Sequence, residues 1–398
     1  MRNHRGSARN EVSSRRQQWP EAQEKAPVDV RNPRAGRGDD EEEMPRVVIT
    51  RRRALLFGFF VISVVAFLYF VLPKLAGLKQ SWQRIEHGEP GWLAAAAMLE
   101  LCSFVGYVAL FRTVFVRGRT RIGWKASYEI TMAGLAATRL FAAAGAGGIA
   151  LTAWALRRSG MEPRIVACRM VAFVALLYAV YMGALVICGV GLYTGAFSGA
   201  APIAITIGPA ILGVVAIVLF LAVSLLPADV DRRFESWARG SGRLAHAMAR
   251  IATVPASTAS GIRTAIGLLR ANEPGLLGAL AWWGFDIGVL WATFHAFGSD
   301  TPPIAVIIMA YFVGMLGNTL PLPGGIGGVD GGMIGAFAAF DINFGYATVA
   351  VLAYRVFSFW LPTVPGAVAY LQLRRTVHRW SEERAAERMA AQREAAPA

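Results

Sequence analysis

Charged side chains within apolar segments are the residues of this sequence best suited to do chemistry. An ionised group in hydrocarbon is costly, so it faces a polar cavity or a partner and marks a site of function. The planar fork of N–H donors on an arginine matches a phosphate or a carboxylate. The set comprises Glu100, Arg139, Asp286, His295, Asp330 and Arg355, with Arg169 at the boundary of an apolar segment.

Several of these residues have a structural and a functional interpretation. Arg355 lies too deep in its segment to reach the surface, so it pairs with Asp330 or Asp286 or contacts a lipid phosphate. Asp286 lies among tryptophans and would line the path of a headgroup. Glu100 is interpreted as a satisfied polar residue facing the helix bundle, with proton coupling as the alternative.

A loop rich in glycine and proline is the second candidate feature. Residues 318–332, NTLPLPGGIGGVDGG, lie between apolar segments and hold two prolines and six glycines, so no regular helix continues through them. Such a loop survives at membrane depth only against protein or a polar cavity. Asp330 falls at the expected start of the next helix, where it caps free N–H groups; the same groups would otherwise face a phosphate. The pattern predicts a re-entrant hairpin.

The loop and the arginine that follows it resemble a known family. The residues that carry the resemblance are Pro321, Pro323, Gly324, Gly325, Gly327 and Asp330, and then Arg355 within YRVFSFW. This pattern is similar to the flippase-like transmembrane domain of bacterial lysylphosphatidylglycerol synthases, over roughly residues 51–373, although that family more often has glutamate in place of Asp330. About 25 residues follow Leu373, too few for the soluble synthase domain. The resemblance therefore implies a stand-alone member that translocates the lipid and does not make it.

Composition agrees with a polytopic helical membrane protein. The chain has 398 residues, 55% of them hydrophobic, and a mean hydropathy of +0.44. Its net charge of +14 comes from basic residues at the ends of apolar segments and in the tails, which the positive-inside rule explains without nucleic acid. The three cysteines are dispersed and predict neither a disulfide framework nor a metal site.

Charge asymmetry predicts the topology. Six full spans are expected at about residues 54–72, 92–111, 170–192, 203–226, 276–297 and 348–371. Residues 127–156 are interrupted by Arg139 and by AAAGAGG and have basic residues at both ends, which favours a re-entrant hairpin over a single span. A second hairpin is expected at residues 303–340. Both termini are then cytoplasmic, in a bacterial plasma membrane.

The predicted fold is an all-α polytopic protein in which two halves form an inverted-topology repeat. A disordered cytoplasmic tail (1–50) precedes the transmembrane domain (51–373), whose halves (about 92–226 and 274–373) flank a cytoplasmic connection (227–273) that holds an amphipathic or a plain connecting helix. A cytoplasmic tail (374–398) follows as a helix or a frayed end. Each half holds a hairpin with a glycine loop.

The sequence therefore predicts a lipid flippase-like transporter of an anionic phospholipid or a polyprenyl-phosphate-linked lipid. The alternative is a membrane scaffold that serves a separate lipid synthase or glycosyltransferase. No catalytic set, nucleotide loop, metal site or cofactor motif is recognised, so the protein is not expected to be an enzyme. Oligomeric state is not predicted. Contact with the lipid headgroup is assigned to Arg139, Arg169, Asp286, Pro323, Gly324, Gly325, Gly327, Asp330 and Arg355.

Overall fold

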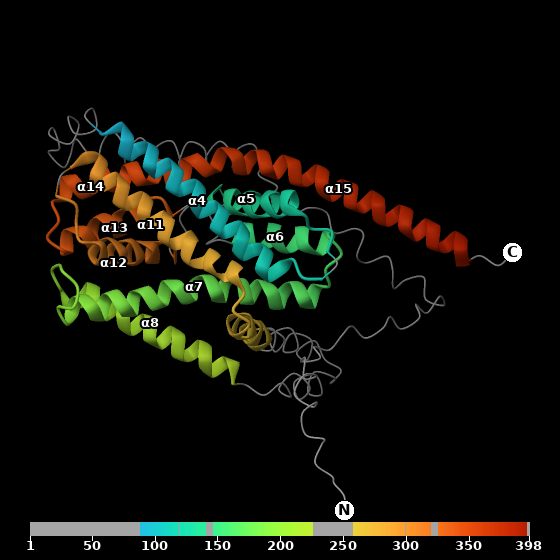
Figure 1. Cartoon of the computed structure of the whole chain (residues 1–398), viewed down its shortest axis with the longest axis horizontal. Coiled ribbons are helices and arrows are strands. Elements are labelled where there is room, and N and C mark those ends of the chain that lie inside the picture. Colours follow the sequence, from blue (N-terminus) through green and yellow to red (C-terminus); the bar gives the residue numbers. More distant parts are fainter. Residues whose placement is uncertain are drawn as a thin grey trace, which may run out of the picture. The chain divides into compact units, whose positions relative to one another are not determined.

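The computed structural model describes residues 88–118, 120–140, 146–225, 258–298, 300–319 and 325–395. All of them belong to one unit of the chain, Val47–Ala398. The predicted tail 1–50, the predicted first span and most of the connection 227–273, including its expected amphipathic helix, lie outside the described residues. Within the described residues every regular element is a helix, as the sequence predicts (Figure 1).

Five helical stretches are long and apolar enough to cross a membrane. The first four are α4 (Pro90–Phe115), α7 (Pro163–Tyr193), α8 (Ile203–Ser224) and α11 (Leu277–Phe297), which follows the short η2 (Pro274–Leu276). The fifth joins α14 (Phe344–Arg355), η5 (Val356–Trp360) and α15 (Leu361–Ala395). At 1.5 Å per residue, even a 21-residue helix is about 32 Å long and spans a hydrocarbon core of about 30 Å. These stretches coincide with five of the six predicted spans.

Two pairs of shorter helices lie between the long ones. The first pair is α5 (Trp124–Leu140) and α6 (Ala146–Arg158). The second is α12 (Ile304–Met315), extended by η3 (Leu316–Thr319), and α13 (Gly328–Ala339). A helix of 13 residues is only about 20 Å long and cannot cross the core alone. Each pair packs side by side (Figure 1).

Glycines permit the close approach of the two helices in each pair. A Cβ atom on Gly148 would collide with the carbonyl of Gly134, and one on Gly317 would collide with the carbonyl of Gly328. Within the first pair Gly134 also faces Thr152, so residue numbers rise on one helix as they fall on the other. The partners are therefore antiparallel, as a hairpin requires, and residues 127–156 are not one continuous helix.

The hydrophobic core lies where α7, α11, α12, α13 and α14 meet. Large side chains there are almost completely excluded from solvent, among them Phe294, Tyr311, Phe337 and Tyr354. By contrast, α8 leaves much of its apolar surface exposed. An apolar helix that is exposed on one side is expected where a protein contacts lipid tails.

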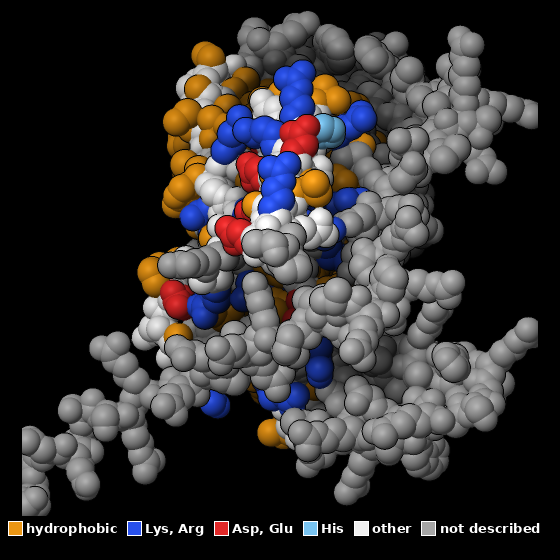
Figure 2. Space-filling model, turned by 90° about the vertical axis from the view of Figure 1, so that its right-hand side faces the viewer, with side chains coloured by type: hydrophobic (Ala, Val, Ile, Leu, Met, Phe, Trp, Pro, Cys, Tyr) orange, Lys and Arg blue, Asp and Glu red, His pale blue; other side chains and the backbone are white. Residues whose placement is uncertain are grey.

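Charged side chains gather at the end of the unit where α15 extends beyond the apolar region. Figure 2 shows lysine and arginine side chains on this face, with fewer acidic ones. Arg121, in the loop after α4, binds Glu383 at 3.1 Å and also contacts Glu387, which ties the loop to α15. Of the two predictions for the residues after Trp380, the helix is the one observed.

Candidate functional site

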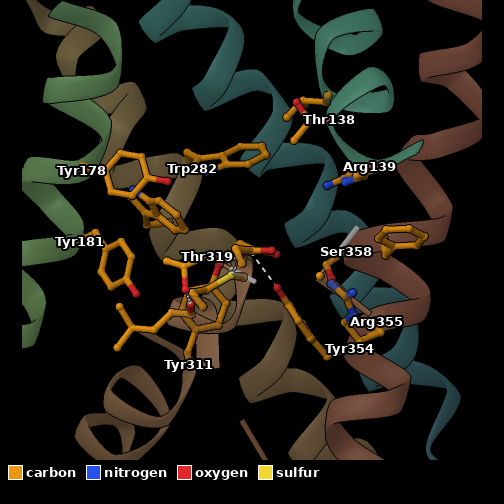
Figure 3. Close-up of a pocket in the computed structure, with 18 of the residues that line it drawn as sticks. Thr138, Arg139, Tyr178, Tyr181, Trp282, Tyr311, Thr319, Tyr354, Arg355 and Ser358 are labelled. Atoms are coloured by element: carbon orange, nitrogen blue, oxygen red, sulfur yellow. Dashed lines mark hydrogen bonds between the residues drawn. The ribbon is translucent and has the colours of Figure 1, made fainter. Parts of the chain in front are cut away.

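A cavity of about 560 Å³ lies between the two helix pairs and the long helices around them (Figure 3). Its lining comes from α5, α7, α11, α12, η3, α14 and η5. Figure 3 shows Arg139 and Arg355 on one side of the cavity and Tyr178 and Tyr181 on the other. The polar residues of the lining are Thr138, Arg139, Tyr178, Tyr181, Asp286, Tyr311, Asn318, Thr319, Tyr354, Arg355 and Ser358.

Arg355 and Asp330 form a buried ion pair at the edge of this cavity. The Arg355 Nε atom lies 2.6 Å from Asp330 Oδ1, and Asp330 is 2% exposed. The second carboxylate oxygen, Asp330 Oδ2, accepts the N–H of Gly327 at 2.9 Å and so caps the start of α13. Of the two carboxylates that the sequence offers to Arg355, the structure selects Asp330. Its capping role and its pairing role coexist.

A π-helical turn presents Arg355 to the cavity. The turn η5 (Val356–Trp360) begins directly after Arg355 and interrupts the helix that continues as α15. Such wide turns re-aim side chains and occur frequently at functional sites. Ser358 and Phe359 of this turn line the cavity, and the Phe359 ring lies 4.9 Å from Arg355 Cζ.

Asp286 lies at the centre of a second polar cluster. Its Oδ2 atom accepts hydrogen bonds from the hydroxyl groups of Tyr311 and Tyr354, the latter at 3.0 Å. Its Oδ1 atom is buried and accepts no hydrogen bond from an N–H or hydroxyl donor among the described residues. The residue is only 6% exposed. A buried carboxylate oxygen without a donor is costly, so this atom is a point where a proton or another ligand would be stabilised.

Glu100 and Arg139 complete this cluster. Glu100 is 1% exposed, and its carboxyl group interacts with both Asp286 and Arg139. Glu100 Oε2 and Arg139 Nη1 are also buried without a hydrogen-bond partner in the described part of the chain. Helices α4 and α11 bring the two carboxyl groups together, because Gly106 and Gly278 allow their backbones to pack closely. Two carboxyl groups therefore face one guanidinium group.

The structure places the remaining predicted site residues in different surroundings. Gly325 lines the cavity and has a φ of +67°, while Gly327 has a φ of +85° at the start of α13; both values favour glycine. Pro323 and Gly324 lie outside the described residues. Arg169 does not line the cavity; its Nη1 atom donates to the carbonyl of Phe115 at 2.8 Å, at the end of α4.

Several residues of the site are absent from the sequence-based assignment. Tyr311 and Tyr354 hold Asp286, and Glu100 adds the second carboxyl group. The sequence contained a signal for Glu100, since it interrupts an apolar span. It contained none for the tyrosines, which are common in apolar helices. His295, by contrast, packs against Trp92 and Trp291, with ring centroids 4.6 and 4.1 Å away.

The chemistry of the cavity suits an anion. Arg139 offers N–H donors, and hydroxyl groups from α5, α7, α12, η3, α14 and η5 surround the same space. Among the described residues, no group of three or more His, Cys, Asp or Glu side chains is arranged to hold a metal ion. A cavity of this size is within the range of about 300–1,000 Å³ that is usual for small-ligand sites.

Comparison with known proteins gives one family and two relatives. A family model described as "Lysylphosphatidylglycerol synthase TM region" matches residues 55–366. Two proteins of Methanothermobacter thermautotrophicus, each named "UPF0104 membrane protein", are 36% identical over 110 residues and 33% identical over 115 residues. Each match covers 27% of this chain. The chain spans only about one third of the length of these curated relatives, 31% and 34%.

Proposed function

This chain belongs to the family of lysylphosphatidylglycerol synthase transmembrane regions, and we propose that it moves a lipid with an anionic, phosphate-bearing headgroup between the two leaflets of a membrane. The observation that carries the proposal is Arg139: its Nη1 atom is buried beside a polar cavity and lacks a hydrogen-bond partner among the described residues. The cargo is an anionic phospholipid or a polyprenyl-phosphate-linked lipid.

A headgroup phosphate would occupy the space between Arg139 and the tyrosines opposite. The planar guanidinium group donates two parallel hydrogen bonds to a phosphate. Thr138 lies beside Arg139 on the cavity wall (Figure 3), where its hydroxyl group donates to the carbonyl of Gly134 at 3.0 Å. Arg355 is held by Asp330 at 2.6 Å, whereas the Arg139 Nη1 atom has no hydrogen-bond partner among the described residues, so its N–H groups are the more accessible donors for a headgroup. The acyl tails would remain in the bilayer.

The proposed mechanism of access depends on the two helix pairs. We interpret them as re-entrant hairpins that enter from opposite faces, within six spans related as an inverted-topology repeat. Their antiparallel packing and their length, too short for a full crossing, support this. In transporters of this architecture one repeat moves against the other and opens the midplane site alternately to each side. The glycine-lined contacts would be the surfaces that hold each hairpin together as it moves.

The proposed orientation places both termini in the cytoplasm of a bacterial cell. The end of the unit that carries Lys125, Arg374, Arg375 and Arg379 would face inwards. Transport would proceed without catalytic residues or a cofactor. A separate lipid synthase or glycosyltransferase would supply the cargo.

The test is lipid exchange in vesicles that contain the purified protein. Vesicles of phosphatidylcholine with a minor fraction of fluorescent phosphatidylglycerol report exchange when a membrane-impermeant reductant bleaches the outer leaflet. We expect the wild-type protein to accelerate exchange, and Arg139→Gln to reduce the rate by at least about tenfold, equivalent to about 1.4 kcal/mol of lost stabilisation.

Arg117→Gln is the matched control, because Arg117 is a surface arginine paired with Glu273 at 2.8 Å, away from the cavity. It should retain the wild-type rate. A membrane scaffold would leave exchange at the rate of empty vesicles in all three proteins, and that result would refute transport of this class of lipid.

A further inference from the structure

The cavity wall and the buried groups that interact with it contain together one more acidic than basic group: Asp286, Glu100 and Asp330 against Arg139 and Arg355. Arg355 is balanced by Asp330. Arg139 then faces the carboxyl groups of both Glu100 and Asp286. If the three carboxyl groups and the two guanidinium groups were all ionised, these five side chains would carry one net negative charge in a buried place. Charges of one sign that share a site of low dielectric constant cannot all remain ionised without a large electrostatic cost.

A single proton resolves this imbalance. Glu100 Oε2 and Asp286 Oδ1 are both buried, and neither accepts a hydrogen bond from an N–H or hydroxyl donor among the described residues. The two carboxyl groups interact with each other, so a proton on one oxygen can donate to the other. The other oxygen of Asp286 is already engaged by Tyr311 and Tyr354. The free oxygens are therefore the places at which a proton is stabilised.

In the described part of the chain, the groups that surround the pair supply no further positive charge to balance it. The ionisable residues that interact with the pair or line the cavity beside it are Arg139 from α5, Tyr178 and Tyr181 from α7, Tyr311 from α12, and Tyr354 and Arg355 from α14, with Asp330 of α13 behind Arg355. Tyrosine hydroxyl groups donate to Asp286 but carry no positive charge. The carboxyl pair and an incoming anion would therefore compete for the same positive group, the guanidinium group of Arg139.

We propose that Glu100 and Asp286 couple the binding of an anionic headgroup at Arg139 to the uptake of one proton. The proposal rests on the proposed function, because it assigns the same cavity to a phosphodiester anion. Before the anion binds, Glu100 and Asp286 share one proton, which balances the charge of the set. When the anion binds Arg139, the carboxyl pair loses its positive partner and takes up a second proton from water at the open face. Release of the anion at the other face reverses both steps. One lipid anion and one proton then move together, and the net transfer is electroneutral.

The first experiment measures proton linkage directly. The purified protein in detergent is titrated with dioctanoyl phosphatidylglycerol over a series of pH values. The phosphodiester of this probe does not titrate near neutral pH. The dissociation constant of the wild-type protein should rise as pH rises, by up to about tenfold per pH unit for one linked proton. Calorimetry in two buffers of different ionisation enthalpy should show about one proton taken up per lipid bound.

The decisive variant is the isosteric double substitution Glu100→Gln with Asp286→Asn. A single substitution leaves one carboxyl group that can still take up a proton, so only the double variant removes the linkage. It should bind the probe with a dissociation constant that is independent of pH. The matched control is Glu129→Gln, which alters a buried carboxylate that binds Thr376 at 2.6 Å outside this cavity. That control should follow the wild-type pH dependence.

The second experiment separates this inference from the proposed function. Vesicles with the fluorescent phosphatidylglycerol are given a pH difference across the membrane. Coupled movement should concentrate the lipid in the leaflet that faces the more alkaline side, approaching about tenfold per pH unit for one proton per lipid. Exchange without any response to the pH difference would overturn the coupling and leave the transport function intact. Proton-linked binding without exchange would support the linkage and refute transport. The linkage would be overturned if the dissociation constant of the wild-type protein did not change with pH, or if the probe did not bind.

Discussion

The two helix pairs are built alike, but their charged residues are held differently. In the α12–α13 pair, Asp330 caps its own helix through Gly327 with one oxygen and forms an ion pair with Arg355 through the other, although this second oxygen makes no hydrogen bond among the described residues. In the α5–α6 pair, Arg139 makes no ion pair within 4.0 Å of a described carboxylate, and its Nη1 atom lacks a hydrogen-bond partner there. A satisfied buried charge stabilises the fold, whereas an unsatisfied one is available to a ligand.

This difference assigns the two arginines to separate tasks, although the sequence presents them as equivalent. Arg355 is chiefly a structural residue that fixes the π-helical turn and the start of α13. Arg139 is the residue that we propose to bind the ligand. Both lie on the same side of the cavity (Figure 3), so the comparison depends on partners and not on position.

The largest expected effect on stability follows from breaking the ion pair between Arg355 and Asp330. Arg355→Ala should lower the free energy of unfolding by about 3–5 kcal/mol, because it leaves the Asp330 carboxylate buried without its partner. Combining it with Asp330→Asn should recover a large part of this loss, since no buried charge remains. Thermal unfolding in detergent measures both. Equal stability of Arg355→Ala and the wild-type protein would contradict the structural role.

A smaller effect is expected from separating the helices of the second pair. Gly317→Ala should destabilise the protein by about 1–3 kcal/mol, because the new methyl group would meet the carbonyl of Gly328. Gly335→Ala is the control: it lies on α13, and a Cβ atom there meets nothing within 4 Å. Denaturation of the two variants in the same detergent should differ by this amount. If both were equally stable, the pair would not be held by close backbone contact.

The smallest effect on stability is expected at Arg139. Arg139→Gln should change the free energy of unfolding by less than about 1 kcal/mol, because the guanidinium group makes no ion pair within 4.0 Å among the described residues and proton uptake by Glu100 or Asp286 would replace its charge. Lipid exchange should nevertheless fall, as proposed above. The same thermal measurement that tests Arg355→Ala tests this variant. A loss of stability as large as that of Arg355→Ala would remove the distinction between the two arginines.

Much of the fold was accessible from the sequence, because membrane insertion constrains local composition strongly. Apolar runs near twenty residues located five described spans, and the breakers around Gly325 and Gly327 located the start of α13. Asp330 was correctly placed in the first turn of that helix. These features depend on neighbours in the chain, so local sequence is sufficient to predict them.

The ion-pair partner of Arg355 could not be predicted from local sequence in the same way. The sequence offered Asp330 or Asp286 to Arg355, and only the packing of α13 against α14 brings Asp330 to 2.6 Å. Glycines did not identify the helix pairs unambiguously either. Gly195, in the loop after α7, has a φ of +74°, which is similar to that of Gly327. A positive φ therefore does not separate a hairpin glycine from an ordinary turn glycine.

The sequence by itself determined that this is a helical membrane protein of a recognisable family, with charged residues buried in its spans. The reason is that hydrocarbon excludes charges and unpaired backbone groups wherever they occur. Only the tertiary structure decided which charged side chains form ion pairs and which do not. Glu100, Arg139 and Asp286 come from α4, α5 and α11, and their interaction depends on how these helices pack. No local pattern encodes that arrangement, because each helix contributes a single charged group.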